Sequence, residues 1–441
     1  MSWISEKTSE FVYYTWTRQK GVVPIEIAGG EGVWFWDTAG KRYLDFASQV
    51  FNANLGHQHP RVVEAIKRQA ESLAVAGPKM AYEAKALLGE TLARVTPGDL
   101  RKSFFCLGGA EANENAVKMA RTVTGRQKII TRYRSYHGAT LGALALTGDP
   151  RRHPFEPLAP GIVRVHDPYC WRCPFGQKVE TCHRECVSSI EEIIELEGPE
   201  SIAAILLEGI SGANGVVVGP DDYWPRIRKL CDKYGILLIS DEVFTGLGRT
   251  GKWFAVDHWN VVPDMITMAK GLGAGHLPLG AVVTSDAIAR YYDENPLVGG
   301  LTSYAPPICV AAALEAVRAC EDERLPEKVA ALEPLLMGRL REMRARYPLI
   351  GDVRGRGLLG IIELSVPGTN QPLVPFNASA KDMERLAPLV KTFSERGLYI
   401  TVRWNYVIVA PPLIITQSDL MKGLDMIEEG IAALAPQEVA L

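Results

Sequence analysis

The sequence lacks long hydrophobic runs and strong net charge, and each absence excludes a class of protein. No apolar segment in the 441 residues approaches the roughly 20 residues needed to span a bilayer, so we expect no membrane segment. The net charge of -3 gives no electrostatic reason to expect binding to nucleic acid or an anionic membrane. The first residues, MSWISEK, lack the basic start and apolar stretch of a signal peptide. We therefore expect a cytoplasmic protein.

The sequence also has no repeats or low-complexity segments, and what remains is ordinary globular composition, with 47% hydrophobic and 22% charged residues. At this length we expect more than one core. Strand-like runs alternate with amphipathic helical stretches, which predicts an α/β fold. We expect helices at 60–73 and 223–234, strands at 104–107, 202–207, 236–240 and 265–268, and a hairpin at 33–45 with its turn at Ala39-Gly40.

The segment DMITMAKGLG, residues 264–273, ends a β-type apolar run with a lysine among glycines. Desolvation at the end of a buried strand lowers the pKa of a lysine, and the neutral amine of Lys270 could then form a Schiff base with an aldehyde. A solvated loop lysine is the alternative. Residues 236–243 form a second apolar run that ends in Asp241 and Glu242. Ligands bind at such strand ends, and Asp241 could hold a pyridine nitrogen protonated, cap a helix or bind a metal.

Residues 104–114, FFCLGGAEANE, run from a short apolar strand through two glycines into a helical stripe. A helix that begins in this way is an anion site, because its free N–H groups and its dipole favour negative charge. An ordinary tight turn is the alternative. Tyr136, followed by His137 and Gly138, could stack on a flat cofactor or belong to the core.

Taken in order, these residues resemble the class III aminotransferases, pyridoxal-phosphate enzymes of fold type I, over nearly the whole chain. The motifs that carry the resemblance are GGAEANE at 108–114, YHG at 136–138, DEV at 241–243, TG at 245–246, GRTG at 248–251, KG at 270–271, GDVRG at 351–355, GL at 357–358 and PPL at 411–413.

The resemblance implies a large cofactor-binding domain at 55–310, with a mostly parallel seven-stranded sheet between helices. Residues 1–54 and 311–441 would form a smaller α+β domain. The family also implies a homodimer or a dimer of dimers. No linker in the sequence marks these boundaries, so they depend on the resemblance.

The resemblance also implies a role for each matching residue. Lys270 corresponds to the Schiff-base lysine and Asp241 to the partner of the pyridine nitrogen. The other implied cofactor contacts are Val243 and Tyr136 on the two ring faces, His137 beside them, Gly109 and Ala110 at the phosphate, Glu208 at a neighbouring strand end, and Thr302 toward the phosphate of the neighbouring subunit. The implied substrate residues are Trp16, Phe51 and Arg403.

Three positions depart from the family pattern. Ala110 stands where a hydroxyl residue is usual, and Gly209 stands where a proline usually follows the glutamate. The arginine that grips a substrate carboxylate usually lies ten residues before the Pro-Pro pair, where this chain has Thr401. Arg403 lies two residues later, and therefore on the same face of a strand. It could still serve, or it could instead pair with a surface acid.

The implied reaction transfers an amino group from a small amine donor to a keto acid such as pyruvate. Thr15-Trp16, the segment FNANLG at 51–56 and the lack of an acyl-phosphate or nucleoside signature are most similar to the ω-amino acid:pyruvate transaminases, a group that includes taurine enzymes. An aminomutase, racemase or decarboxylase reaction on the same cofactor is the alternative. Donor, preferred acceptor and stereochemistry stay open.

A nucleotide-binding enzyme is a remote alternative, because residues 246–252, GLGRTGK, have most of a P-loop pattern. That loop needs Ser or Thr after the lysine to hold magnesium, and this chain has Trp253. No clear amphipathic helix follows it, although both nucleotide readings require one.

Four of the eight cysteines lie within seventeen residues, at Cys170, Cys173, Cys182 and Cys186. The C-x2-C-x8-C-x3-C spacing could hold structural zinc. Free thiols or disulfides are the alternatives. We expect no metal, because the middle spacing is shorter than in common zinc ribbons. A purely metal-binding or scaffolding protein would leave Lys270 and Asp241 unexplained.

Overall fold

The computed structural model describes the backbone of residues 2–439 and the side chains of residues 2–435. Its centre is a seven-stranded sheet, in which β10 is antiparallel to both of its neighbours and the other pairs are parallel. In spatial order the strands are β4 (Lys102–Cys106), β10 (Gly280–Thr284), β9 (Met265–Met268), β8 (Leu237–Asp241), β7 (Ile202–Glu208), β5 (Lys128–Arg132) and β6 (Ile162–Val165). The mostly parallel seven-stranded sheet is confirmed.

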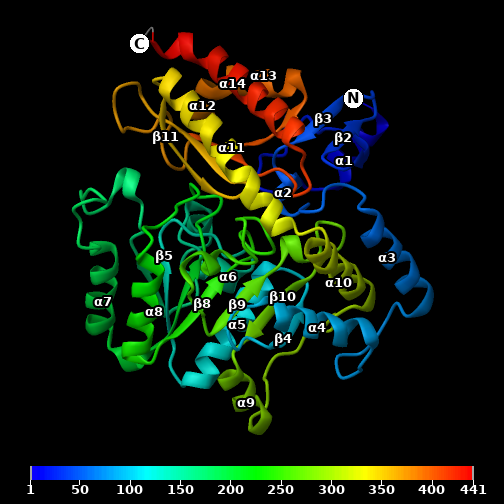
Figure 1. Ribbon diagram of the computed structural model, residues 1–441, viewed down its shortest axis with the longest axis vertical. Helices are drawn as coiled ribbons and strands as arrows, with labels where there is room; N and C mark the ends of the chain where they lie inside the picture. The colour runs from blue at the N-terminus through cyan, green and yellow to red at the C-terminus, as the bar shows by residue number, and fades with distance from the viewer. Residues whose placement is uncertain (1, 440–441) are drawn as a thin grey trace.

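Helices cover the central sheet, as the strand sequences require. Every residue of β7 is buried, because its apolar side chains meet helices on both faces. α5 (Gly109–Thr124) packs against the sheet through its buried alanine and methionine side chains. α8 (Tyr223–Tyr234) packs against β8, with α7 (Glu185–Glu197) outside it (Figure 1). The predicted helix at 223–234 and strand at 265–268 are confirmed to the residue.

A second region lies above the central sheet in Figure 1 and joins the two ends of the chain. Its antiparallel sheet contains β11 (Ile350–Arg356), β12 (Leu359–Leu364), β15 (Tyr406–Val409) and β14 (Thr401–Arg403). A further sheet contains β1 (Ile27–Glu31), β2 (Trp34–Asp37), β3 (Arg42–Asp45) and β13 (Leu398–Tyr399). β2 and β3 are the predicted hairpin, and β13 pairs with β3, so the N-terminal segment packs with the C-terminal third.

The remaining helices cover these sheets and connect them. They are α1 (Trp3–Phe11), α2 (Ser48–Phe51), α3 (Pro60–Ser72), α4 (Glu83–Val95), α6 (Leu141–Leu146), α9 (Asp286–Glu294), α10 (Pro307–Asp322), α11 (Leu325–Arg346), α12 (Ala380–Met383), α13 (Ala387–Arg396) and α14 (Gln417–Val439). α10 packs against α3 and α4, and α13 packs against α14. None of the described helices is both long and apolar enough to cross a bilayer.

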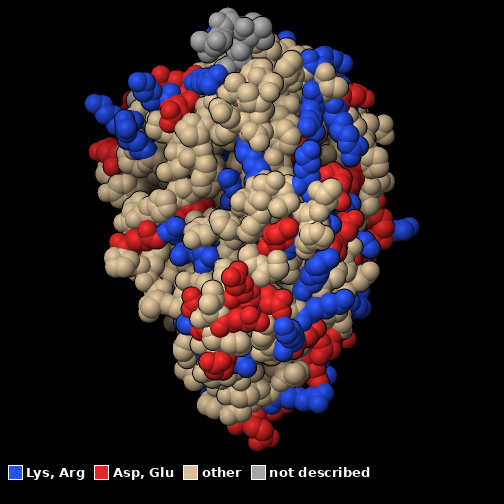
Figure 2. Space-filling model, turned by 90° about the vertical axis from the view of Figure 1, so that its left-hand side faces the viewer, with Lys and Arg blue, Asp and Glu red and all other residues tan. Residues whose placement is uncertain are grey.

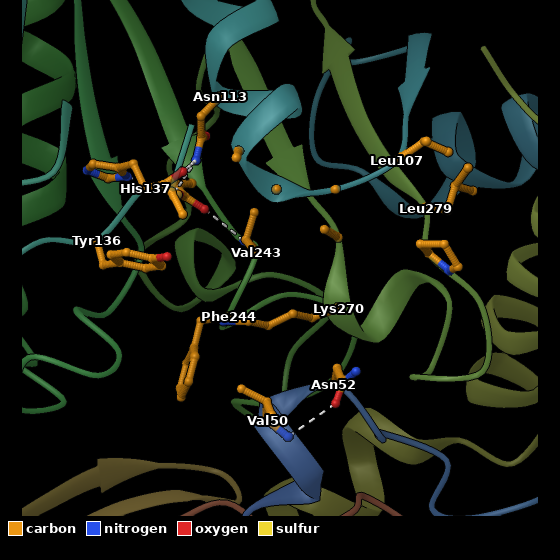
Figure 3. Close-up of a pocket in the computed structure, with 18 of the residues that line it drawn as sticks. Val50, Asn52, Leu107, Asn113, Tyr136, His137, Val243, Phe244, Lys270 and Leu279 are labelled. Carbon is orange, nitrogen blue, oxygen red and sulfur yellow. Dashed lines mark hydrogen bonds and ion pairs between the residues drawn. The ribbon is translucent and has the colours of Figure 1, made fainter. Parts of the chain in front are cut away.

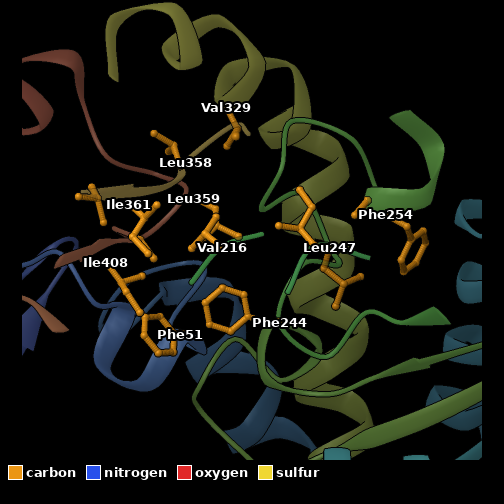
Figure 4. Packing of buried hydrophobic residues seen from close by; sticks show 14 of the residues in the cluster. Phe51, Val216, Phe244, Leu247, Phe254, Val329, Leu358, Leu359, Ile361 and Ile408 are labelled. Carbon is orange, nitrogen blue, oxygen red and sulfur yellow. The ribbon is translucent and has the colours of Figure 1, made fainter. Parts of the chain in front are cut away.

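Buried side chains from distant segments meet where the two regions join (Figure 4). Phe51 lies there between Phe244 and Ile408. Arg249 is buried at this junction, where it donates to the Leu358 carbonyl (3.1 Å) and to Asn54 Oδ1 (3.0 Å).

The glycine loop at 246–252 therefore has a structural role. A short 3-10 helix, Ala255–Trp259, follows it, so the helix N-terminus that a nucleotide phosphate would require is missing there. The structure thus gives the nucleotide-binding alternative no support.

Candidate active site

The ends of β7, β8 and β9 and the start of α5 surround a cavity of about 570 Å³ (Figure 3). The side chains of Tyr136, Val243 and Lys270 point into it, and Val50 and Asn52 approach from the N-terminal segment. Eight of the residues predicted from the sequence line this cavity: Gly109, Ala110, Tyr136, His137, Glu208, Asp241, Val243 and Lys270. The folding of separate strand ends to one edge brings them together.

Lys270 begins a short 3-10 turn, Lys270–Leu272, directly after β9. Its φ of +40° lies in the left-handed region, which is unusual for a residue with a side chain. Nζ lies 4.6 Å from the centre of the Phe244 ring. Burial lowers the pKa of Lys270 to about 8, although the charges of Asp241 and Glu208 act in the opposite direction. Roughly one amine in ten is therefore neutral, and nucleophilic, at pH 7, far more than for an exposed lysine.

Asp241 is held by donors on both carboxylate oxygens. Oδ2 accepts from His137 Nδ1 (2.7 Å) and from Asn113 Nδ2 (2.8 Å), and Oδ1 accepts from the backbone N–H of Val243 (3.0 Å). Thr267 Oγ1 in turn donates to Asn113 Oδ1 (2.7 Å). These hydrogen bonds fix the orientation of the carboxylate, and the contact to Oδ2 requires that His137 carries a proton on Nδ1.

The start of α5 forms a close-packed cradle. A Cβ on Gly109 would lie 2.8 Å from Val243 Cγ1, so only glycine fits under that side chain. A Cβ on Gly138, whose φ is +138°, would lie 2.4 Å from Ala110 Cβ. The exposed N–H groups of this first helical turn suit a phosphate.

Glu208 is buried at the end of β7, and burial raises its pKa. It accepts from the backbone N–H groups of Tyr136 (3.0 Å) and Gly212 (2.8 Å) and so fixes two loops of the cavity wall. A Cβ on the following residue, Gly209, would lie 2.6 Å from Ala255 Cβ. This crowding explains why the usual proline is absent there.

A second group of side chains gathers beside Tyr136. The Arg151 guanidinium lies 3.5 Å from the centre of the Tyr136 ring and 5.5 Å from that of Trp16, and Trp16 meets Tyr136 edge-on at 6.4 Å. The buried carboxylate of Asp149 accepts from Arg151 Nε (2.9 Å) and from Arg403 Nη2 (3.3 Å). Burial, and to a smaller extent the charge of Arg151, lowers the pKa of Arg403 to about 10. One carboxylate thus serves two guanidinium groups.

The remaining predicted residues lie outside the cavity lining. Arg403 pairs with a buried acid rather than the surface acid of the alternative hypothesis. Phe51 contributes its ring beside Phe244, with the ring centres 4.6 Å apart. Thr302 is exposed.

Sequence reasoning missed Asn113, Phe244, Asp149 and Arg151. Asn113 was visible as a polar residue on the buried face of α5, three positions before Ala116, where an amide side chain needs hydrogen-bond partners. The sequence DPRR at 149–152 was a signal for Asp149 and Arg151, because an aspartate directly before a proline is a helix-start pattern in which the carboxylate accepts from the residues that follow.

The residues of the cavity fit an aldehyde-bearing pyridine phosphate. Lys270 provides a desolvated amine for the aldehyde, and Asp241 provides an oriented carboxylate for the pyridine nitrogen. The start of α5 provides an anion site for the phosphate. Tyr136 provides a flat side chain, and Val243 a branched one, for contact with the ring. We found no group of three or more His, Cys, Asp or Glu side chains suited to a metal ion within the described part of the chain.

Comparison with known proteins shows which family has this fold and this set of cavity residues. The family model of class III aminotransferases matches residues 15–431. A leucine/methionine racemase of Thermococcus litoralis is 36% identical, over 93% of this chain and 91% of the relative. A taurine–pyruvate aminotransferase of Rhodobacter capsulatus is 34% identical, over 93% of this chain and 92% of the relative.

Solved structures agree over almost the full length of both chains. A taurine:2-oxoglutarate aminotransferase of Bifidobacterium kashiwanohense, solved with PLP and glutamate, superposes with a TM-score of 0.94 at 37% identity, covering 98% of each chain. An (S)-enantioselective omega-transaminase of Thermomicrobium roseum gives a TM-score of 0.91 at 35% identity, covering 99% of this chain and 98% of that one. The chain therefore belongs to the class III aminotransferases and is a pyridoxal-phosphate-dependent enzyme.

Proposed function

We propose that the enzyme transfers the amino group of an ω-amino acid or a primary amine to pyruvate or a similar keto acid. The observation that carries this proposal is the pair Arg151 and Arg403 on the single carboxylate of Asp149, beside Tyr136 at the cavity. Because two guanidinium groups share one buried carboxylate, the group as a whole is positively charged. This charge can attract an acidic group of the substrate. Taurine, a sulfonate, is named for two of the similar proteins.

The geometry suits a carboxylate or sulfonate better than a neutral tail. A guanidinium binds such an anion through two parallel hydrogen bonds, and lysine lacks this planar fork. Arg151 lies flat against Tyr136, so its orientation is fixed by the ring as well as by Asp149. Trp16 and Phe51 add apolar surface, which would contact the carbon chain between the amine and the acid.

Bound pyridoxal phosphate supplies an aldehyde and a protonated ring that accepts electrons from the reacting carbon. In our proposal the N-terminus of α5 would hold the phosphate through Gly109 and Ala110, and Asp241 would keep the ring nitrogen protonated. Tyr136 and Val243 would contact the ring. His137 and Asn113 orient Asp241 and so act as positioning residues.

Lys270 would move the proton. Its Nζ must be neutral to accept a proton from the substrate carbon, and a pKa of about 8 makes this form available at pH 7 to 8. After the carbonyl product leaves, the same amine would return the proton while the keto acid takes up the amino group. The kinetic pattern should be ping-pong.

A second candidate is amino-acid racemisation, favoured by the similarity to the Thermococcus litoralis racemase. The test is a panel of taurine, β-alanine, 4-aminobutyrate and neutral amines with pyruvate, in which alanine is measured by chiral chromatography. We expect alanine with at least one acidic donor. Inversion of a single amino acid without any keto acid, and no alanine from the panel, would instead support a racemase.

For the assembly, we propose a homodimer or a dimer of dimers in the cytoplasm, with Thr302 of each subunit directed toward the cofactor phosphate of the other. The exposure of Thr302 is compatible with such a contact. Sedimentation of the loaded enzyme tests the subunit number.

A further inference from the structure

Three of the four clustered cysteines lie in the loop at residues 166–184 that connects β6 to α7, and Cys186 lies in the first turn of α7 beside them; the proposed reaction does not use them. All four side chains line one small enclosed cavity of about 20 Å³, together with Asp167 and Glu185. All four are free thiols in this structure. No metal-binding group of side chains occurs here or elsewhere in the described residues. The loop therefore brings four reduced thiols together without a metal-ligand arrangement.

One of these thiols has an activating neighbour. Arg184 Nη1 donates to Cys182 Sγ at 2.7 Å, and a guanidinium in this position can stabilise the negative charge that the sulfur carries when it attacks an electrophile. Arg184 is held in turn by Asp222, with 2.6 Å between Nε and Oδ1. Cys182 is partly exposed, so a small reagent can reach it.

Two of the other thiols, those of Cys186 and Cys170, are placed to react second. Burial, and to a smaller extent the nearby thiols of Cys170, Cys182 and Cys173, raises the pKa of Cys186 to about 12. Burial also raises the pKa of Cys170, with added contributions from Cys173 and Cys182. These thiols stay protonated near neutral pH and do not compete with Cys182 for an oxidant. The shared cavity places them near its sulfur.

We propose that Cys182 is a peroxide-reactive thiol whose oxidation ends in a disulfide with another cysteine of the same cavity. Its thiolate attacks hydrogen peroxide, so that an S–O bond forms, the O–O bond breaks, and the departing hydroxide takes a proton to leave as water. A second thiol then attacks the sulfenic sulfur, which forms the S–S bond and releases the other oxygen as water after proton transfer. Two thiols give up two electrons and one peroxide becomes two waters.

The disulfide would lie at a contact between the two regions of the molecule. Trp171 and Arg172 stand between Cys170 and Cys173, and Arg172 pairs with the buried Glu363 of β12 and donates to Ser365 Oγ at 3.2 Å. Trp171 lies under the Arg344 guanidinium at 5.4 Å. A disulfide here would restrict the movement of the segment that makes these contacts.

The sequence makes the pairing directly measurable. Trypsin cleaves after Arg164, Arg172, Lys178 and Arg184, so each of the four cysteines falls in a different peptide. Reduced holoenzyme is treated with a few equivalents of hydrogen peroxide, alkylated, digested and analysed by mass spectrometry. We expect the 179–184 peptide, which carries Cys182, to be cross-linked to one of the other three peptides of the loop.

Three variants test the assignment of roles. Cys182→Ser should abolish the cross-link, and Arg184→Gln should slow it by roughly tenfold, because the thiolate loses its donor. Arg184→Lys keeps the charge and should retain part of the rate. Cys309→Ser, a partly exposed cysteine outside the loop, is the matched control and should change nothing.

Several results would overturn the proposal. One is a Cys182 that remains fully alkylatable after peroxide, and another is a cross-link to a cysteine outside the loop. An unchanged rate in Arg184→Gln would remove the activating role of the guanidinium. One equivalent of zinc in enzyme purified without added metal would also overturn it, since the thiols would then be metal ligands. Thermal unfolding of each variant shows whether it is folded.

Discussion

The two ends of the active site are held in different ways. At the cofactor end, Glu208 and Asp241 stand opposite each other on paired strands, and Asp241 stands opposite Thr267 on the next strand. Backbone and buried side-chain donors fix each carboxylate. At the substrate end, Arg151 and Arg403 come from segments about 250 residues apart and are held mainly by Asp149 and by aromatic rings.

This difference means that the residues responsible for the chemical step and the residues that select the substrate lie in separate parts of the site. Strand ends in a packed sheet have little freedom, so the distance between amine and carboxylate is fixed by the fold. Side chains on connecting segments can be exchanged with less effect on the core. We therefore expect mutations at the cofactor end to abolish every reaction of the enzyme, and mutations at the substrate end to change the order of preference among substrates.

The largest effect is expected for Lys270→Ala. It removes both the amine that bonds the aldehyde and the base that moves the proton, so turnover should fall by on the order of 10⁴-fold or more. The purified variant should also lose the yellow colour and the borohydride-trappable cofactor. Arg403→Ala is the control and should keep both. Transamination by Lys270→Ala at a normal rate would exclude this lysine from catalysis.

The next largest effect is expected for Asp241→Asn. The amide has nearly the same size but no charge to hold the ring nitrogen protonated, so the variant should bind cofactor and lose several kcal/mol of transition-state stabilisation, by about the magnitude seen when a preorganised group is removed. Single-turnover absorbance changes measure this loss in each half-reaction, and both should slow equally. A near-normal rate would remove Asp241 from the mechanism.

The cofactor end was also the part that the sequence predicted best. Asp241 and Lys270 each follow a continuous apolar run, and such runs become strands buried on both faces, whose ends meet at one edge. The boundaries shifted by one or two residues: the strand expected at 236–240 is Leu237–Asp241, because Asp241 pairs with Thr267 of β9.

The substrate end was predicted poorly for a physical reason. Arg151 acquires its position through Tyr136, Trp16 and Asp149, and no local periodicity encodes contacts between irregular segments. Arg403 was predicted from its strand face, but its buried partner was not, because Asp149 lies 254 residues away in the chain. Hydrogen bonds such as that from Asn113 to Asp241 also depend on tertiary packing.

A smaller and more selective effect is expected for Arg403→Ala. Pyruvate should lose on the order of 100-fold in the half-reaction that reloads the cofactor, because a charged, two-bond contact is removed. Neutral amines should lose much less. Arg151→Ala is the matched comparison, since it shares Asp149. Equal losses for pyruvate and neutral amines would show that Arg403 has a structural role only and would place the acid-binding function elsewhere.

The smallest effect is expected for Thr302→Ala, which tests whether the cofactor end is completed by a second subunit. The phosphate site at the start of α5 has Ala110 where a hydroxyl residue is usual. A hydrogen-bond donor from the partner subunit would therefore contribute a larger share of the binding of the phosphate. Loss of one hydrogen bond to a phosphate should weaken cofactor retention by about tenfold, measured by dialysis and absorbance. Dilution of the unmodified enzyme should release cofactor and activity together, because separated subunits would lose the same donor. Ser303→Ala is the matched control for a general disturbance of this turn, and we expect it to retain cofactor normally. A fully active monomer, observed by sedimentation during turnover, would contradict the shared site.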